Sequence, residues 1–298
     1  MTLSIFDAAR EAPRRTAIVG DGVSVTFAEL AARVERRLGE LHAAAALDPA
    51  GRRPVLLVAH ATLPTIETLL ALLAAGTPVL LGHPRATPFE LEALTRRAGA
   101  VVEPARGQPG DAPPLAAFDP ERIAVLMPTS GTTGEPRLVL LSHRALLAAA
   151  RASAENLGVE DDRWLLSLPL AHVGGLGVLL RSLVNRRAVA LFTPEKSLLR
   201  ELDRFVLACE RLRVTLVSLV PTILERLLAP PIEWRPPPSL RAVLVGGAAI
   251  PRSLIARARR AGIPALPTYG MTETCAQITT GRYAARLDLP APGHELFP

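Results

Sequence analysis

Residues 127–137 are the part of this chain that is richest in groups able to hold a phosphate, and they read Met-Pro-Thr-Ser-Gly-Thr-Thr-Gly-Glu-Pro-Arg. Glycine lets the backbone turn sharply, and successive backbone N–H groups in such a turn bind anions. The hydroxyl side chains would add donors, and the arginine a permanent positive charge. The segment is not a Walker A loop, because no Gly-x-x-x-x-Gly-Lys-Ser/Thr occurs. A polar surface turn after a strand is the alternative interpretation. The candidate phosphate-binding residues are Thr129, Ser130, Gly131, Thr132, Thr133, Gly134 and Arg137.

A second group of residues suited to a nucleotide lies near the end of the chain, in Val-Gly-Gly-Ala-Ala at 245–249 and Tyr-Gly-Met-Thr-Glu-Thr at 269–274. Tyr269 offers a flat face for an adenine ring, and the small residues at 246–248 would let a base lie on backbone. The glycine pair also predicts a tight strand-to-helix turn. Both interpretations can hold together, because nucleotides bind at the carboxyl ends of parallel strands. The small residues are Gly246, Gly247 and Ala248.

These segments, with Leu-Pro-Leu-Ala-His-Val-Gly-Gly at 168–175, resemble in order and spacing the motifs of the adenylate-forming superfamily. That superfamily contains acyl- and aryl-CoA ligases, luciferases and peptide-synthetase adenylation domains. The likeness holds through Pro136 and then departs, since the family continues Lys-Gly where this chain has Arg137 and Leu138. The stretches from Tyr269 to Ile278 and from Gly246 to Pro251 are most similar to the o-succinylbenzoate–CoA ligases of menaquinone biosynthesis.

The resemblance implies an enzyme that uses ATP to activate an aryl or acyl carboxylate as its adenylate and then transfers the acyl group to CoA. It implies that the 129–134 segment holds the β- and γ-phosphates and that Glu273 binds Mg²⁺, an ion that takes one or two protein carboxylates besides phosphate oxygens. It also implies that His172 lines the acyl site, although not as a general base, because the substrate carboxylate is already ionised at neutral pH. Considered without its motif, Glu273 would be an ordinary exposed carboxylate, and His172 a satisfied structural residue. The remaining nucleotide-binding positions are Gly270, Met271 and Thr272.

The acyl site offers two further expectations. Ala171 stands where the family usually has an aromatic residue, so the acyl pocket should differ in shape. Arg181 follows His172 at helical spacing and could meet a second carboxylate on the substrate, but a solvated helix position is the favoured interpretation.

Two family features are not found among these 298 residues: a ribose-binding aspartate in Thr-Gly-Asp, and a small C-terminal domain that supplies a lysine. Lys196, the sole lysine, precedes the last two motifs and cannot substitute for it. We therefore expect residues 1–298 to be an incomplete large N-terminal domain with little turnover alone. The alternatives are an adenylation domain that loads a carrier protein and an ATP- or adenylate-binding module without turnover.

Short apolar runs alternate with helical patterns along most of the chain, which predicts an α/β fold with mostly parallel sheets and flanking helices. Nine candidate strands exceed the usual sheet and favour two stacked, doubly wound sheets. Thr26-x-x-Glu29 and Thr87-Pro-Phe-Glu90 predict capping boxes, and Ser142 and Pro251 should each open a helix. The expected strands are 55–59, 78–81, 100–102, 123–127, 164–167, 188–191, 216–219, 243–245 and 265–268.

Composition limits the other classes of function. The hydrophobic content is 49%, enough for a large core, and the net charge of +6 could indicate a nucleic-acid or membrane partner. We expect neither, because the arginines are scattered, aromatic residues make up only 4%, and pairs such as Arg36-Arg37 read as solvated helix faces. Cys209 and Cys275 lack metal-ligand spacing, and we interpret them as unpaired thiols. Unpaired thiols are typical of a reducing compartment, so we expect a cytoplasmic protein. The expected partners are a small carboxylate and CoA, with a homodimer possible.

Overall fold

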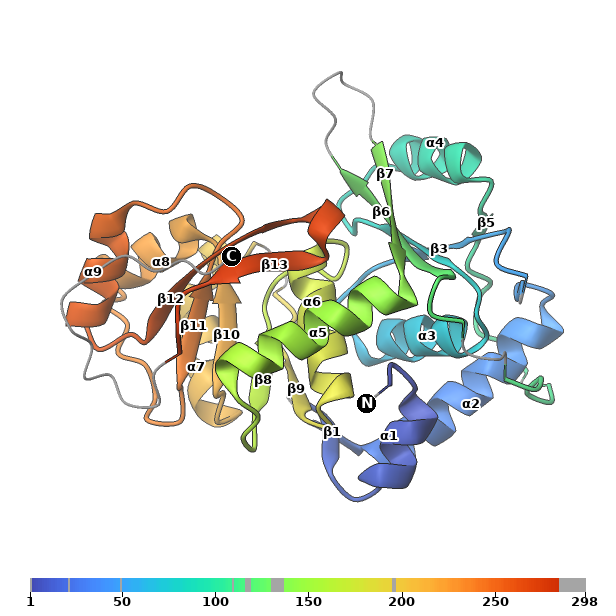
Figure 1. The fold of residues 1–298 in the computed structure, drawn as a ribbon, viewed down its shortest axis with the longest axis horizontal. Helices are drawn as coiled ribbons and strands as arrows, with labels where there is room; N and C mark the ends of the chain where they lie inside the picture. Colours follow the sequence, from blue (N-terminus) through green and yellow to red (C-terminus); the bar gives the residue numbers. More distant parts are fainter. Residues whose placement is uncertain are drawn as a thin grey trace.

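The chain folds into two β-sheets with helices between and outside them, as the computed structural model shows (Figure 1). The structure describes residues 2–20, 22–48, 50–108, 110–115, 119–129, 137–194 and 197–283. The expected phosphate-binding residues Ser130, Gly131, Thr132, Thr133 and Gly134 therefore lie outside the described residues. The expected α/β class with two parallel-rich sheets is confirmed.

The larger sheet contains eight strands, and its inner pairs are parallel. Antiparallel pairs stand at its two ends, where β12 meets β13 and β1 meets β2. In spatial order the strands are β13 (Ala276–Thr280), β12 (Ala265–Met271), β11 (Ala242–Val245), β10 (Leu216–Leu219), β8 (Arg163–Leu166), β9 (Ala188–Leu191), β1 (Thr16–Gly20) and β2 (Val23–Thr26).

The smaller sheet contains five strands and ends in one antiparallel pair, β6 with β7. In spatial order they are β5 (Val101–Val102), β3 (Val55–Val58), β4 (Val79–Gly82), β6 (Ile123–Thr129) and β7 (Arg137–Ser142). All nine expected strands are present, with bounds shifted by a few residues, and four more were not expected: β1, β2, β7 and β13.

Helices occupy three layers around the two sheets. The central layer fills the space between the sheets and belongs to one hydrophobic core with them; in Figure 1, α5 and α6 cross the middle of the molecule. Its helices are α1 (Ile5–Glu11), α2 (Phe27–Ala43), α3 (Leu63–Ala74), α5 (His143–Leu157) and α6 (Val173–Val184). The outer layers are α7 (Leu202–Arg211), α8 (Pro221–Leu228) and α9 (Arg252–Arg260) on the larger sheet, with the short helix η1 (Leu198–Arg200), and α4 (Pro88–Ala98) on the smaller one.

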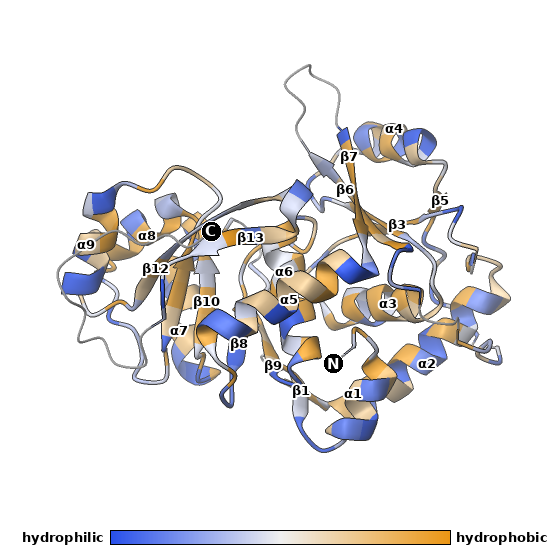
Figure 2. Ribbon diagram, in the orientation of Figure 1, coloured by the Kyte–Doolittle hydropathy of each residue, from blue (hydrophilic) through white to orange (hydrophobic). Residues whose placement is uncertain are grey.

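Side-chain alternation along the strands produces these layers, because successive residues of a strand point to opposite faces. In β8, Leu165 packs against the outer helices, whereas Trp164 and Leu166 belong to the central core. Helices follow the same logic. In Figure 2, α3 is hydrophobic over most of its length, and its residues 65–73 are buried all round. The strands are apolar on both faces because both faces are covered.

The expected helix starts are confirmed. Thr26 and Glu29 form a capping box on α2, and Thr87 and Glu90 form another on α4. The hydroxyl of Ser142 accepts a hydrogen bond from the Ala145 N–H at 3.2 Å and caps α5. Each cap stabilises its helix by about 1 kcal/mol. Pro251 precedes α9, as predicted.

The expectation that Arg36-Arg37 mark a solvated helix face is wrong for Arg37, which is 1% exposed. Its guanidinium donates to Glu40 at 2.7 Å, to Glu103 at 2.8 Å and to the Thr68 hydroxyl at 3.0 Å. This network joins α2 and α3 to the segment that follows β5. Among the described residues, no helix is both long and apolar enough to cross a membrane.

Candidate functional site

The hairpin strands on either side of the candidate phosphate segment are described, and one of them contacts the turn that follows β12. The candidate phosphate segment connects β6 to β7, and the residues that flank it, Thr129 and Arg137, are paired across this antiparallel hairpin. The Thr129 hydroxyl donates to the Arg137 carbonyl at 3.5 Å, and the Arg137 side chain is exposed. The short helix η2 (Thr272–Thr274), which follows β12, contacts β7. The strand β7, which follows the phosphate segment, and the turn around residue 273 are therefore neighbours in space although they lie far apart in sequence.

The small residues after β11 and the tyrosine of β12 lie at the carboxyl ends of neighbouring parallel strands. A Cβ atom on Gly246 would stand 2.7 Å from the Thr268 methyl and 2.8 Å from its carbonyl oxygen, so only glycine permits this approach. Gly247 has a φ of +81°, the left-handed region that favours glycine, and Ala248 is exposed. Tyr269 is 56% exposed beside them. An exposed tyrosine and glycine backbone thus lie at the same edge of the larger sheet, where parallel sheets bind nucleotides.

The turn at η2 presents a carboxylate outward. The Thr274 hydroxyl donates to the Met271 carbonyl at 3.0 Å and accepts from the Met271 N–H at 3.2 Å, which closes the turn. Glu273 is exposed, and no described residue donates a hydrogen bond to it. Thr272 is half-buried and Met271 exposed. A free carboxylate next to the hairpin of the phosphate segment fits a magnesium ion that is shared with phosphate oxygens.

Gly270 fixes the geometry of this turn, because a Cβ there would stand 1.4 Å from the Ala276 carbonyl oxygen of β13. We expect Gly270→Ala to force β12 and β13 apart, to lower the free energy of unfolding by about 1–3 kcal/mol and to displace Tyr269 and Glu273. Urea unfolding and nucleotide calorimetry measure the two effects. Gly107→Ala is the matched control, since a Cβ at Gly107 meets nothing within 4 Å. Equal stability of both variants would contradict the packing argument.

His172 begins α6 as its N-cap residue, and its ring pairs with that of His83, which follows β4 of the other sheet. The ring centroids are 5.3 Å apart and tilted by 47°. The Nδ1 atom of His83 accepts a hydrogen bond from the Arg85 N–H at 3.0 Å, so the neutral ring carries its proton on Nε2. No role was expected for His83 from the sequence, and the structure places it directly against the expected acyl-site residue.

Histidine protonation should make the fold pH-dependent. Burial lowers the pKa of His83, and His172 and Arg85 lower it further; burial also lowers the pKa of His172 and of His143. Because these pKa values lie below those of the unfolded chain, the unfolded state binds more protons than the folded state below about pH 6.5. The free energy of unfolding therefore decreases as the pH is lowered through this range. We expect urea unfolding to show lower stability at pH 5.5 than at pH 7.5. His83→Asn should reduce this difference, and an unchanged difference would exclude His83 as a contributor.

Arg181 is not the solvated helix residue that was the favoured interpretation. It lies in the last turn of α6, is 4% exposed, and burial lowers its pKa to about 10. Its guanidinium stands 5.3 Å from the centroid of the Trp164 ring and against Gly177. The Nε and Nη2 atoms are buried without a hydrogen-bond partner among the described residues. A buried cation without a counter-charge is costly, so it indicates a site for an anionic group.

Two cavities share Arg181. The first, which we call the helix cleft, lies between α5 and α6 and holds about 240 Å³ of empty space, its open mouth included. It reaches from Val173, next to His172, to Cys275, next to the η2 turn. Burial raises the pKa of Cys275 to about 11, so its thiol stays neutral and acts as a small apolar group. The cleft is lined by Leu146, Ala149, Ala150, Val173, Leu176, Gly177, Leu180, Arg181 and Cys275.

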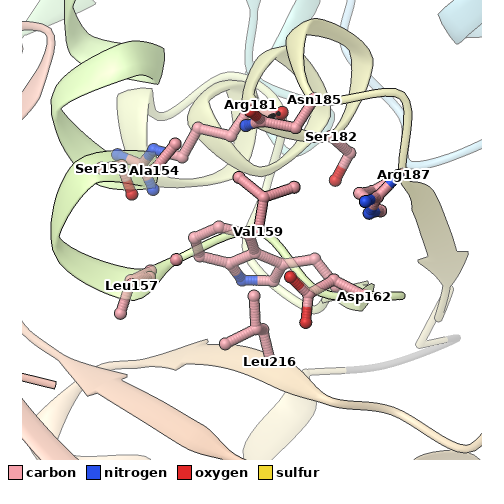
Figure 3. A pocket seen from close by; sticks show the side chains of 12 residues that line it. Ser153, Ala154, Leu157, Val159, Asp162, Arg181, Ser182, Asn185, Arg187 and Leu216 are labelled. Carbon is pink, nitrogen blue, oxygen red and sulfur yellow. Dashed lines mark hydrogen bonds between the residues drawn. The ribbon is translucent and has the colours of Figure 1, made fainter. Parts of the chain in front are cut away.

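The second cavity, which we call the rear chamber, lies on the β8 side of α6 and holds about 320 Å³, its open mouth included (Figure 3). In Figure 3 the side chain of Arg181 runs along one wall, with its guanidinium beside Ser153 and Ala154 of α5. The other polar lining residues are Asp162, Trp164, Ser182, Asn185 and Arg187.

The part of the candidate site that sequence reasoning missed is the set of neighbours of α6. One signal was available: Arg181 is the sole charged residue of a helix whose other residues, apart from Ser182, are apolar or glycine, and such a helix is buried. No sequence signal could have found the His83–His172 pair, because its members come from different sheets.

Comparisons with known proteins agree with the motifs. A family model described as AMP-binding enzyme matches residues 101–296. The 2-succinylbenzoate–CoA ligase of Geobacillus kaustophilus is 34% identical over 315 residues, which cover 96% of this chain and 61% of the ligase. That of Bacillus subtilis is 32% identical over 299 residues, which cover 93% of this chain and 60% of the ligase. The chain thus spans about three fifths of the length of these relatives.

Solved structures show the same relation. The o-succinylbenzoate coenzyme A synthetase of Bacillus subtilis in complex with AMP superimposes with a TM-score of 0.82 at 28% identity, over 95% of this chain and 61% of that one. The same synthetase with its acyl-adenylate intermediate gives a TM-score of 0.79, at 28% identity and the same coverage. The synthetase in complex with ATP and magnesium ion superimposes with a TM-score of 0.77 at 29% identity, over 93% of this chain and 61% of that one.

Proposed function

Because this chain belongs to the family of AMP-binding enzymes, we propose that it is the greater part of a ligase that uses ATP to join 2-succinylbenzoate to coenzyme A. We propose that residues 1–298 belong to its large N-terminal domain and that it works in the cytoplasm. Its two cysteines are free and buried, which is in keeping with a reducing compartment.

Arg181 is the observation that carries the choice of acid. A monocarboxylic acid would place its only carboxylate at the ATP and leave the guanidinium of Arg181 without an anion. An acid with a second carboxylate can extend it along the helix cleft to Arg181, which would supply the counter-charge that the buried cation lacks. An apolar cleft with one charged group in its wall suits an aromatic dicarboxylate.

The reaction needs the acid carboxylate in line with the α-phosphorus of ATP. One carboxylate oxygen forms a bond to that phosphorus, the bond to the β-phosphate breaks, and pyrophosphate leaves. In the second step the thiol of coenzyme A attacks the acyl carbon and AMP leaves. The protein's share is to position and to stabilise charge. Tyr269 and Gly246 would hold the base, Arg137 the phosphates, and Arg181 the far end of the acid.

The charge state of His172 matters for the acid. Its pKa is lowered by burial, so the ring is neutral at pH 7 and its N–H can orient the reacting carboxylate without forming an ion pair with it. A bound Mg²⁺ supplies positive charge for the phosphates, and Glu273, an exposed carboxylate of the short helix η2, which contacts β7, would hold it. A protonated His172 would form an ion pair with that carboxylate in place of the neutral N–H contact, so activity should fall as the pH drops below the ordinary histidine pKa of 6.5.

We expect Glu273→Ala to weaken binding of Mg·ATP about tenfold or more, because the ion loses its protein carboxylate, with little change in stability. Calorimetric titration with and without magnesium measures the effect. Glu210→Ala, at an exposed position of α7 on the outer layer, is the matched control. If the Glu273→Ala chain bound Mg·ATP as tightly as the control, the metal assignment would be wrong.

The substrate is tested by binding, which does not require turnover. A stable analogue of the 2-succinylbenzoyl adenylate should bind at least tenfold tighter than the benzoyl analogue, which lacks the second carboxylate. Equal affinities would remove 2-succinylbenzoate from consideration. Measurement of pyrophosphate exchange with either acid then separates a catalytic chain from a module that only binds, and a test with free coenzyme A separates a CoA ligase from a domain that loads a carrier protein.

A further inference from the structure

We propose that the rear chamber is a binding site for one small monovalent inorganic anion of the size of chloride or bromide. The chamber lies on the far side of α6 from the helix cleft and shares only Arg181 with it. The proposal concerns the chain without substrate and does not depend on the acid that the protein activates.

Several residues that line the chamber carry buried hydrogen-bond donors without a partner. Trp164 Nε1, Ser182 Oγ and Ser153 Oγ are buried there without a hydrogen-bond partner, together with Nε and Nη2 of Arg181. Their residues are 3–9% exposed. Buried polar groups in native proteins are nearly always bonded, so five such atoms in one cavity indicate a missing acceptor. Among the described residues, Asn185 Oδ1 is the one unpartnered lining atom that can accept a hydrogen bond but not donate one.

The charges in the chamber wall favour an anion over a neutral molecule. Arg181 and Arg187 are positive, and the guanidinium of Arg187 donates only to the backbone carbonyls of Glu160 and Arg186. Asp162 is the one carboxylate in the wall. Both of its oxygens are taken up by Arg241, at 2.7 and 2.8 Å, and one also accepts from the Thr215 hydroxyl at 2.8 Å. The wall therefore retains positive charge that no described carboxylate neutralises.

The remaining wall selects the kind of anion. Leu157, Val159 and Leu216 line the chamber alongside the donors, so an ion that enters loses much of its hydration. Loss of hydration is least unfavourable for large, weakly hydrated monovalent ions and most unfavourable for fluoride and sulfate. We expect affinity in the order bromide, chloride, fluoride, with sulfate excluded.

An anion in the chamber would hold Arg181 from the side opposite the helix cleft. If the proposed acid binds Arg181, the two ligands share one cation, and the anion should weaken binding of the acid. This consequence alone rests on the proposed function.

The test is thermal unfolding of the 298-residue chain in millimolar sodium salts at constant ionic strength. General salt effects stabilise proteins with sulfate and not with bromide. The chamber should reverse that order, and 100 mM bromide should raise Tm by about 3 °C over fluoride. Bromide also quenches tryptophan fluorescence on contact. In a Trp234→Phe chain, Trp164 is the sole tryptophan, and its quenching should saturate with bromide concentration.

Arg181→Met should abolish the bromide effect, Arg181→Lys should retain part of it because the charge is kept, and Ser182→Ala should weaken it severalfold. Arg211→Met, at an exposed position of α7, is the matched control and should leave it unchanged. A bromide effect that is linear in concentration, or that persists in Arg181→Met, overturns the proposal and leaves water as the occupant. Neither result bears on binding of the acyl adenylate, so the two proposals fail separately.

Discussion

Asp162→Ala should lower the free energy of unfolding by about 3–5 kcal/mol, the largest stability change that we expect from a single side chain in this protein. Asp162 is 7% exposed and accepts two hydrogen bonds from Arg241, at 2.7 and 2.8 Å. Burial alone would lower the pKa of Arg241, but its bonds to Asp162 raise it overall. Without Asp162 the guanidinium would be left buried and uncompensated.

The position of this pair explains why its loss should matter. Arg241 precedes β11 and also donates to the carbonyl of Leu157 at 2.7 Å, while Asp162 precedes β8 and accepts from Thr215. The pair thus joins the end of α5 to three strands of the larger sheet. Glu160→Ala is the matched control, because the Glu160 side chain is 62% exposed and stands 4.0 Å from Arg241. We expect it to change stability by less than about 0.5 kcal/mol, as isolated surface pairs do. Urea unfolding that gave similar values for both variants would contradict this account.

Arg181→Met should change stability and binding in opposite directions. Burial lowers the pKa of Arg181 to about 10, below that of the unfolded chain, so at pH 7 the charged side chain disfavours the folded state. Methionine has a similar length and no charge. Although its contact with Trp164 would lose a cation–π interaction, we expect a net gain of about 1 kcal/mol in buffer without small anions. Affinity for the 2-succinylbenzoyl adenylate analogue should fall about 100-fold, because the second carboxylate loses its partner.

The controls for Arg181 separate charge from packing. Arg181→Lys keeps the charge but not the planar fork, so it should retain part of the affinity and none of the gain in stability. The benzoyl analogue lacks the second carboxylate, and its affinity should be nearly the same in all three proteins. A Met variant that was less stable and bound both analogues equally poorly would show that Arg181 only fills space.

Sequence patterns predicted the parallel strands well because those strands are covered on both faces and are apolar throughout, as in Leu-Leu at the centre of β3. The four strands that were not expected belong to antiparallel pairs at sheet ends. In β2, Val-Ser-Val-Thr has only Val25 fully buried, and its two polar residues made the segment resemble a turn. The strand β7 follows directly on the polar phosphate segment and has exposed residues such as Leu140.

In the candidate site, too, contacts within one sheet were predictable from the sequence and contacts between layers were not. The placement of Gly246 and Tyr269 at the same edge of the larger sheet was predictable, because the carboxyl ends of adjacent parallel strands lie at one edge of a sheet. Contacts between the layers were not predictable, because the spacing of His83, Trp164 and Arg181 in the sequence does not indicate which helix packs on which sheet. Burial of Arg181 is a tertiary property, and it overrides the usual preference of arginine for the surface.

The place of α6 between the two sheets also has a consequence for laboratory evolution. The residues that line the helix cleft, such as Leu176 and Leu180, are at the same time core residues of the central layer. A substitution that reshapes the cleft for a different acid therefore disturbs packing, and selection for new substrates should enrich second mutations that restore stability. Cys275 belongs to the same core, but it follows the short helix η2 and is not part of a helix of the central layer. Libraries that vary position 275 first should yield altered acid preference with the fewest compensating changes.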